Sequence, residues 1–219
     1  MKIRITESQY NNFIERSLEE EYPVNWSVDD FKKLRSFNAR IKYCEKNLIR
    51  ISSGSSRIVY KIDDTKVLKL AKNRKGIAQN EVEISYSNDY YLKNIIAEVI
   101  EYDENDLWVE MELARKVTPV FFKNIVGVSF DEYCNVMRYQ HSETFGRRSY
   151  ISHSKPENMD EMWENEFVSN MIDAMINYEM PVGDLCKLST YGLVKRDGYE
   201  KIVLIDYGLT NNVYDSYYK

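Results

Sequence analysis

The sequence is poor in cysteine, in long apolar runs and in excess basic charge, and each of these shortages excludes a class of protein. Its three cysteines, Cys44, Cys134 and Cys186, are widely separated and odd in number, so they indicate neither a disulfide framework nor a cysteine-ligated zinc site. The net charge of -5 offers no basic stripe for nucleic acid. No stretch approaches the roughly 18 consecutive apolar residues that a membrane helix needs. We therefore expect a soluble, cytoplasmic protein whose partners include neither nucleic acid nor a membrane.

The chain nevertheless carries enough apolar material for a real core. Of its 219 residues, 43% are hydrophobic and 13% aromatic, which suffices for one globular unit or for two small lobes. The opening region, residues 1–47, predicts helices, because Thr6 with Gln9 and Ser27 with Asp30 are typical of helix starts and precede apolar residues at helical spacing. We interpret this region as an N-terminal helical extension that turns its apolar side chains towards the core.

Residues 48–114 predict a strand-rich lobe. Short apolar runs bounded by turn residues indicate strands at 48–51, 57–62, 66–71, 95–102 and 107–112, with a helix at 76–91 inserted after the third strand. The first three strands should form an antiparallel meander. This order predicts a five-stranded antiparallel sheet with one helix.

Residues 115–219 predict a second lobe that is mainly helical. Ser129 with Glu132 forms another capping box, and a helix at 159–178 ends before Pro181. The polar stretch between them, residues 141–156, is typical of a loop. Apolar runs on both sides of Asp197-Gly198 then predict a hairpin.

A lysine in the third predicted strand is unusual for its position. Lys69 stands between Leu68 and Leu70, and an ammonium group that points inward from a half-buried strand needs an anionic partner. Glu81 and Glu83 in the following helix are the candidates, and they lie on different helix faces, so only one can point inward. We choose Glu81. In the alternative interpretation Lys69 points outward and has no special role.

Two acidic residues near the carboxyl end stand beside apolar runs. Asp184 lies in Gly183-Asp184-Leu185, and Asp206 follows the run Ile202–Ile205 and begins Asp206-Tyr207-Gly208. The predicted hairpin would present both carboxylates to one region. The alternative is a surface hairpin whose two aspartates are incidental.

Together with the order of strands and helices, these residues resemble the protein-kinase-like superfamily. Val67-Leu68-Lys69-Leu70 is similar to its Val-Ala-Ile-Lys motif, Gly183-Asp184-Leu185 to its His-Gly-Asp-Leu, and Asp206-Tyr207-Gly208 to its Asp-Phe-Gly. The resemblance implies an α+β, two-lobed fold in which the five-stranded sheet and its helix are joined to a reduced, mainly helical second lobe.

The resemblance also implies ATP and Mg²⁺ as cofactors and a role for each site residue. Lys69 and Glu81 would hold the phosphates beneath a turn formed by Gly54 and Ser55. Met111 would lie behind the adenine, which the main chain of Glu112 and Ala114 would bind. Asp206 and Ser189 would hold the metal, and Asp184, the catalytic residue alongside Lys69, would orient the acceptor hydroxyl.

Several positions depart from the family pattern. The turn keeps Gly54 alone, with Ser52 and Arg57 at the two outer glycine positions. The histidine before Asp184 is missing, and Ser189 stands where the family has a metal-binding asparagine. A hydroxyl is a poorer ligand for Mg²⁺ than an amide or carboxylate oxygen, so these changes weaken the case for fast chemistry.

Gly208 stands eleven residues before the last residue, Lys219, so the segments that dock peptide substrates in protein kinases do not follow it here. Minimal kinase-like chains of this kind occur in tailed phages, and for a phage protein the setting would be the host cytoplasm or the virion. We do not expect a protein substrate to bind in the usual way.

These observations lead to two hypotheses of different classes. The first is a Mg·ATP-dependent phosphotransferase with an unidentified acceptor; transfer of AMP is also open, because the same groups can hold ATP reversed. The second is a catalytically impaired pseudokinase that binds a nucleotide or a protein partner, or serves as a virion scaffold. The first requires Lys69, Asp184 and Asp206 to surround one cleft.

Overall fold

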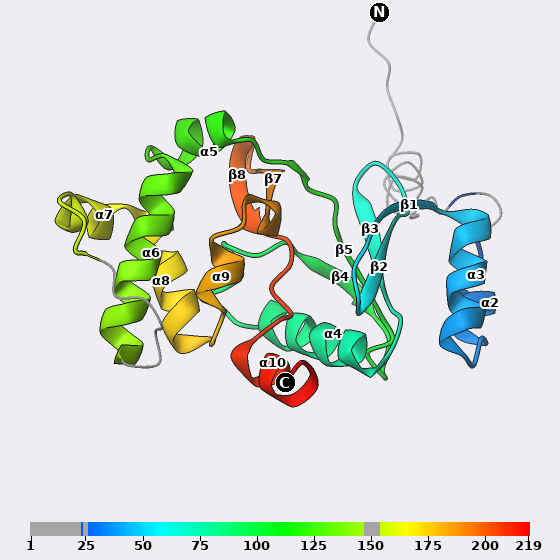
Figure 1. Ribbon diagram of the computed structural model, residues 1–219. Coiled ribbons are helices and arrows are strands. Elements are labelled where there is room, and N and C mark those ends of the chain that lie inside the picture. The colour runs from blue at the N-terminus through cyan, green and yellow to red at the C-terminus, as the bar shows by residue number, and fades with distance from the viewer. Residues whose placement is uncertain (1–22, 24–25, 147–153) are drawn as a thin grey trace, which may run out of the picture.

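A five-stranded antiparallel sheet forms the centre of one half of the molecule in the computed structural model, which describes residues 23, 26–146 and 154–219 (Figure 1). Its strands are β1 (Ile49–Ser53), β2 (Arg57–Lys61), β3 (Lys66–Ala71), β4 (Val99–Tyr102) and β5 (Trp108–Glu112), in the spatial order β1-β2-β3-β5-β4. The predicted meander and the two later strands are confirmed.

The fourth strand is shorter than the sequence predicts, because the residues before it pair elsewhere. Ala97 donates its N–H to the carbonyl of Leu204 at 2.8 Å, and Leu204 donates to the carbonyl of Ile95 at the same distance. Residues 95–97 therefore join the sheet to the hairpin of the other lobe instead of extending β4.

Alternation along β3 gives the sheet two chemically different faces, since successive side chains of a strand point to opposite sides. On the face that we call the apolar face, Leu68 and Leu70 pack with Tyr60 and Trp108. Helices α2 (Val28–Lys32) and α3 (Phe37–Asn47) cover this face with Phe31 and Cys44, and Trp26, just before α2, packs beside them. Lys69 points to the opposite face, which we call the charged face, and α4 (Arg74–Ser87) lies against it.

Side-chain caps determine where these helices begin. Ser27 accepts a hydrogen bond from Asp30 N at the start of α2, as the sequence predicts. Asn73 caps α4 by accepting from Lys75 N and Gly76 N, so this helix starts two residues earlier than predicted. The predicted start at Thr6 and Gln9 lies outside the described residues.

The second half of the molecule is mainly helical, as predicted. Its elements are β6 (Arg115–Lys116), α5 (Pro119–Val126), α6 (Phe130–Phe145), α7 (Met159–Glu164), α8 (Glu166–Asn177), α9 (Val182–Leu185), the 3-10 turn η2 (Leu188–Thr190), β7 (Tyr191–Arg196), β8 (Tyr199–Leu204) and α10 (Asn211–Tyr217). The capping box of Ser129 and Glu132 at the start of α6 is confirmed. In Figure 1 the helices α5 to α8 lie on one side of the hairpin and the sheet on the other. The boundaries of domains drawn at residues 48 and 115 stay predictions.

Two predictions for this half are wrong in detail. The helix predicted over 159–178 is broken at Asn165, whose side chain caps α8 through Val168 N and donates to the carbonyl of Val126 at 2.7 Å. The loop predicted to begin at residue 141 begins later, because α6 continues to Phe145. The rings of His141 and Phe145 contact each other one helical turn apart, with centroids 4.9 Å apart and planes tilted by 45°, and such pairs support a helix.

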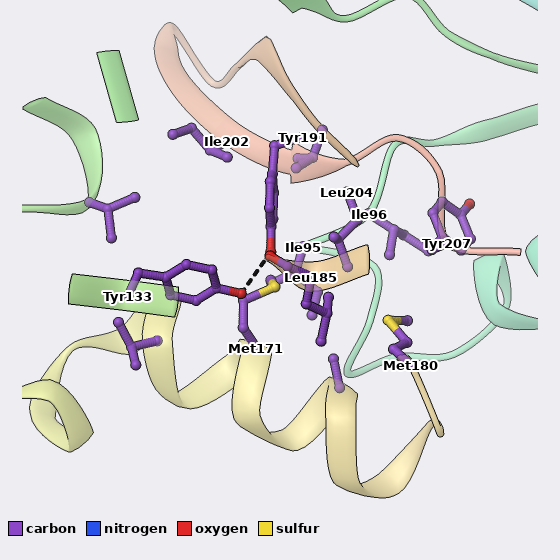
Figure 2. Packing of buried hydrophobic residues seen from close by; sticks show 14 of the residues in the cluster. Ile95, Ile96, Tyr133, Met171, Met180, Leu185, Tyr191, Ile202, Leu204 and Tyr207 are labelled. Atoms are coloured by element: carbon purple, nitrogen blue, oxygen red, sulfur yellow. Dashed lines mark hydrogen bonds between the residues drawn. The ribbon is translucent and has the colours of Figure 1, made fainter. Parts of the chain in front are cut away.

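A pair of buried tyrosines connects α6, α9 and the hairpin (Figure 2). The hydroxyls of Tyr133 and Tyr191 lie 2.7 Å apart, and the hydroxyl of Tyr191 also donates to the carbonyl of Leu185 at 2.8 Å. Burial raises the pKa of both tyrosines well above the ordinary value, so both hydroxyls stay neutral. This contact holds α9, and with it Asp184, against β7.

The β7–β8 hairpin closes with the turn that the sequence predicts. Asp197 and Gly198 have φ angles of 54° and 84°, the left-handed pair of a tight two-residue hairpin turn. Within the described part of the chain, no helix combines the length and apolar character needed to cross a bilayer.

Candidate functional site

Lys69 forms a buried ion pair with Glu83 on the charged face of the sheet. Its ammonium nitrogen lies 2.8 Å from Oε1 and 3.0 Å from Oε2 of Glu83, and 2.6 Å from the carbonyl oxygen of Ile205. The two side chains are only 7% and 0% exposed. Lys69 therefore points inward and joins β3 to α4 and to the end of β8.

The prediction that Glu81 pairs with Lys69 is wrong, because α4 turns a different side towards the sheet. Its buried side carries Gly76, Gln79, Asn80 and Glu83, at spacings of three and four residues. A Cβ on Gly76 would lie 2.3 Å from the carbonyl oxygen of Ser56, so the helix contacts the turn before β2 through bare backbone there. Glu81 instead lines a pocket of about 340 Å³ between α4 and α10.

Glu83 binds the backbone of the Asp-Tyr-Gly segment as well as Lys69. Its Oε1 also accepts hydrogen bonds from the backbone N–H groups of Tyr207 and Gly208, at 3.3 and 3.2 Å. A Cβ on Gly208 would lie 2.3 Å from the carbonyl oxygen of Gln79, so the Asp-Tyr-Gly segment and α4 touch through their backbones. One carboxylate thus holds the third strand and the Asp-Tyr-Gly segment to the same helix.

Arg57 is the functional candidate that the sequence analysis missed. Its guanidinium lies 2.8 Å from Glu83, 3.3 Å from the side-chain oxygen of Asn80 and 2.5 Å from Asp206. Burial acts to lower the pKa of Arg57, but the charges of Glu83 and Asp206 outweigh it and raise that pKa. The sequence shows an arginine at position 57, where the family's turn has its outer glycine. This replacement is the signal that could have identified Arg57.

Asp206 lies at the edge of this network, with its side chain 63% exposed. Desolvation acts to raise the pKa of Asp206, but the positive charges of Arg57, Lys69 and Lys187 outweigh it and hold the pKa below its ordinary value. The pKa of Lys69 is lowered, chiefly by its own burial. The charged face therefore holds an ionised carboxylate that reaches solvent.

Asp184 lies in α9 and pairs with Lys187, whose ammonium is 2.5 Å from its carboxylate. The hydroxyl of Thr190 donates to the main-chain carbonyl of Asp184 at 2.8 Å, and Ile205 N donates to the carbonyl of Thr190 at 2.8 Å. This chain of bonds ties Asp184 to the residue just before Asp206. Ser189, at the predicted metal position, is exposed in η2.

The turn over the predicted phosphate site is attached to the start of α4. Lys72 donates to the carbonyl of Gly54 at 2.8 Å, and the side chain of Asn73 donates to the carbonyl of Ser55 at 3.0 Å. A Cβ on Gly54 would meet nothing nearer than 3.9 Å, so the folded chain itself does not require glycine there. A role for Gly54 and Ser55 in nucleotide binding stays a prediction.

The three residues predicted to hold the adenine lie along the exit from β5. Met111 is buried in the core, the N–H of Glu112 donates to the carbonyl of Glu98 at 2.9 Å, and its carboxylate pairs with Arg196 at 2.5 Å. Ala114 packs against Gly192, because a Cβ added to Gly192 would lie only 2.3 Å from the Cβ of Ala114. Their contact with a nucleotide stays a prediction.

The acidic residues of the site do not fit a divalent metal ion. Asp206 is already paired with Arg57, and Asp184 with Lys187, so each carboxylate has a cation from the chain itself. In residues 26–146 and 154–219, no cluster of three or more His, Cys, Asp or Glu side chains gathers around a common point. At nucleotide sites Mg²⁺ is usually held by one or two carboxylates together with phosphates and water, and here both carboxylates face cations of the chain while Ser189 offers only a hydroxyl.

The five-stranded sheet, its inserted helix and the hairpin that ends in Asp-Tyr-Gly form an α+β fold, as the sequence predicts. Neither the models of known protein families nor the curated proteins include a match to this chain.

Solved structures of similar shape include aminoglycoside phosphotransferases. The ADP-bound enzyme APH(2'')-Ib aligns with a TM-score of 0.33 and 14% identity over 78% of this chain and 69% of its own. The streptomycin-ATP-APH(2'')-IIa ternary complex aligns with a TM-score of 0.34 and 16% identity over 84% and 72%. The gentamicin-APH(2'')-IIa complex aligns with a TM-score of 0.33 and 13% identity over 94% and 71%.

Proposed function

We propose that this protein is a kinase-like phosphotransferase that binds ATP beside the charged face of the sheet and transfers a phosphoryl group to a hydroxyl acceptor. The observation that carries the proposal is the buried Lys69–Glu83 pair, which lies next to an exposed, ionised Asp206. A buried ion pair adds little stability in exchange for its desolvation, so its presence favours a binding role.

The positive groups around this pair supply what a triphosphate needs. Arg57, Lys69, Lys72 and Lys187 come from β2, β3, the start of α4 and the segment after α9. Charge-assisted hydrogen bonds to phosphate oxygens are among the stronger polar contacts in proteins. The turn of Gly54 and Ser55 would cover the phosphates.

In the transfer step the acceptor oxygen attacks the terminal phosphorus, the bond to the leaving oxygen breaks, and ADP departs. The proton of the acceptor hydroxyl passes to the carboxylate of Asp184, which acts as general base. Glu112, Ala114 and Met111 would surround the adenine. The Mg²⁺ implied by the family resemblance, with Asp206 and Ser189 as ligands, does not fit the ion pairs of the site, and no step of this proposal depends on it.

A second candidate is a non-catalytic module that binds a nucleotide or a protein partner. The observation that favours it is the Arg57 guanidinium, which occupies the space between Glu83 and Asp206. The serine at position 189, in place of the family's asparagine, acts in the same direction.

Thermal unfolding with and without ATP tests the binding step. A ligand present at about 100 times its dissociation constant adds about 2.7 kcal/mol to the free energy of unfolding. We expect Lys69→Met to lose this gain. Lys61→Met is the matched control on the neighbouring strand, because Lys61 pairs with the exposed Asp64 and should leave the gain intact.

Release of ADP, with water as a surrogate acceptor, tests the chemistry. Slow ADP formation that Asp184→Asn abolishes while ATP still binds would support the transferase. Binding without ADP formation would favour the second candidate, AMP release would identify transfer of AMP, and absence of ATP binding would contradict the nucleotide site.

A further inference from the structure

We propose that the phosphate site of this protein works without a divalent metal ion, because the Arg57 guanidinium takes the place of the cation that would face Asp206. This inference rests on the proposed ATP site and adds a property that the family resemblance does not imply. The ligand is the unmetallated triphosphate of a nucleotide.

Arg57 is held in place by residues from two elements. Its guanidinium contacts two side chains of α4, Asn80 and Glu83, and the carboxylate of Asp206, which follows β8. Only 7% of its side chain is exposed. A side chain held from two elements at once is fixed in place, and arginine keeps its charge at any ordinary pH.

The positive and negative side chains of the site are equal in number. Arg57 and Lys69 offset Glu83 and Asp206, and Lys187 offsets Asp184, so the network is neutral before any ligand arrives. A divalent ion on Asp206 would lie beside the guanidinium, and repulsion between like charges in a partly buried site opposes its binding.

Arg57 has more hydrogen-bond donors than its protein contacts use. Arginine carries five N–H groups, and the three contacts of Arg57 in the described residues engage three of them. The remaining donors, with Lys72 above the site and Lys187 on its other side, can take phosphate oxygens. Lys72, which contacts the carbonyl of Gly54 and no carboxylate within the described residues, adds a positive charge to this neutral network.

Isothermal titration of ATP into the whole protein, in excess magnesium and again in excess EDTA, tests the inference. We expect the two dissociation constants to agree within about threefold. Asp206→Asn keeps the size of the side chain and removes its charge, and it should leave the affinity unchanged or tighter in both buffers. If Asp206 held a metal, the same substitution would weaken binding in magnesium about tenfold or more.

Arg57→Ala provides the converse test. Removing the guanidinium exposes Asp206 to metal ions, so binding should weaken in EDTA and recover in magnesium. The double variant Arg57→Ala/Asp206→Asn should lose that recovery. Arg115→Ala, which removes an exposed arginine paired with Glu200, is the matched control and should behave as the wild type.

The outcomes separate this inference from the proposed function. Equal affinities in both buffers, with Asp206→Asn harmless, would support both. Binding that requires magnesium and is lost in Asp206→Asn would overturn the metal-free site and leave the ATP site standing. No binding of ATP in either buffer would overturn both. If Arg57→Ala fails to fold, Asp206→Asn decides alone, because Asp206 is exposed and tolerates the change.

Discussion

The two faces of the five-stranded sheet are built from the same strands, but different interactions hold their neighbours in place. On the apolar face, Leu68, Leu70 and Trp108 pack beneath α2 and α3 and are almost completely buried. On the charged face, Arg57 and Lys69 are buried to a similar degree but contact carboxylates. Burial of apolar surface stabilises a fold by about 25 cal/mol per Å², whereas a buried ion network returns little beyond its own desolvation cost.

Alternation along β3 places Leu70 and Lys69 on opposite faces, although the buried Lys66 shares the face of Leu70 and Val67 shares that of Lys69. Neighbouring residues of one strand serve stability and binding, because each side chain points to the opposite side from the next. Substitutions on the apolar face should change stability alone. Substitutions that remove the Lys69–Glu83 pair on the charged face should change both stability and affinity for ATP.

Glu83→Gln should have the largest effect. It leaves the buried charges of Arg57 and Lys69 without their shared carboxylate, and loss of one partner from a buried pair costs about 3–5 kcal/mol. Urea unfolding at neutral pH measures the loss. Glu81→Gln, on the exposed side of the same helix, is the matched control and should change stability by about 0.5 kcal/mol or less. Equal losses in the two variants would contradict the assignment of Glu83.

Leu70→Ala should cost about 2–5 kcal/mol, because it opens a cavity among well-packed side chains on the apolar face. The affinity for ATP, measured well below the unfolding temperature, should stay at the wild-type value. Ile51→Ala, on the exposed edge strand β1, controls for the loss of an aliphatic side chain. A large change in ATP affinity in Leu70→Ala would show that the two faces are not independent.

Tyr207→Phe should cost about 1 kcal/mol, since it removes the hydrogen bond from the hydroxyl to the carbonyl of Ala97 at 3.1 Å. The change is confined to the rear of the charged face and should leave ATP affinity intact. Tyr199→Phe on β8 removes an exposed hydroxyl and should be neutral in the same unfolding experiment. A neutral Tyr207→Phe would mean that its hydroxyl bond contributes nothing measurable.

The smallest effect should come from pH, through Asp206. Because its pKa is lower in the folded state, its ionisation stabilises the fold fully above the ordinary carboxyl pKa of about 4, and this contribution is lost as the pH falls further. The side chain is mostly exposed, so we expect less than about 1 kcal/mol.

The measurement is the difference in unfolding free energy between wild type and Asp206→Asn. It should be constant from about pH 7 to pH 5 and shrink towards pH 3. Asp64→Asn removes an exposed carboxylate from the same sheet and serves as the control. A difference that grows as the pH falls would reverse the assigned direction.

The sequence predicted what local patterns determine. The strand over Lys66–Ala71, the caps at Ser27 and Ser129 and the turn at Asp197-Gly198 are confirmed, because apolar alternation, capping residues and turn residues act over a few neighbours. The inward direction of Lys69 followed from its apolar flanks.

What the sequence could not predict depends on distant contacts. The choice between Glu81 and Glu83 depends on how α4 is rotated, which is decided where Gly76 meets the carbonyl of Ser56. The meeting of Arg57 with Asp206 joins residues 149 positions apart. No local pattern reveals a contact between residues so far apart in the sequence. The sequence therefore shows Arg57 only as the loss of a family glycine, whereas in the fold it places a positive charge beside Asp206.

The backbone contact between Gly208 and Gln79 has a mechanical consequence. With no side chain between the two main chains, the helix and the Asp-Tyr-Gly segment pack directly against each other, and Glu83 bonds the N–H of Gly208. Any tilt of α4 away from the sheet must carry the acid at position 206 with it, so the ammonium of Lys69 would lose its carboxylate and its neighbouring acid in a single motion.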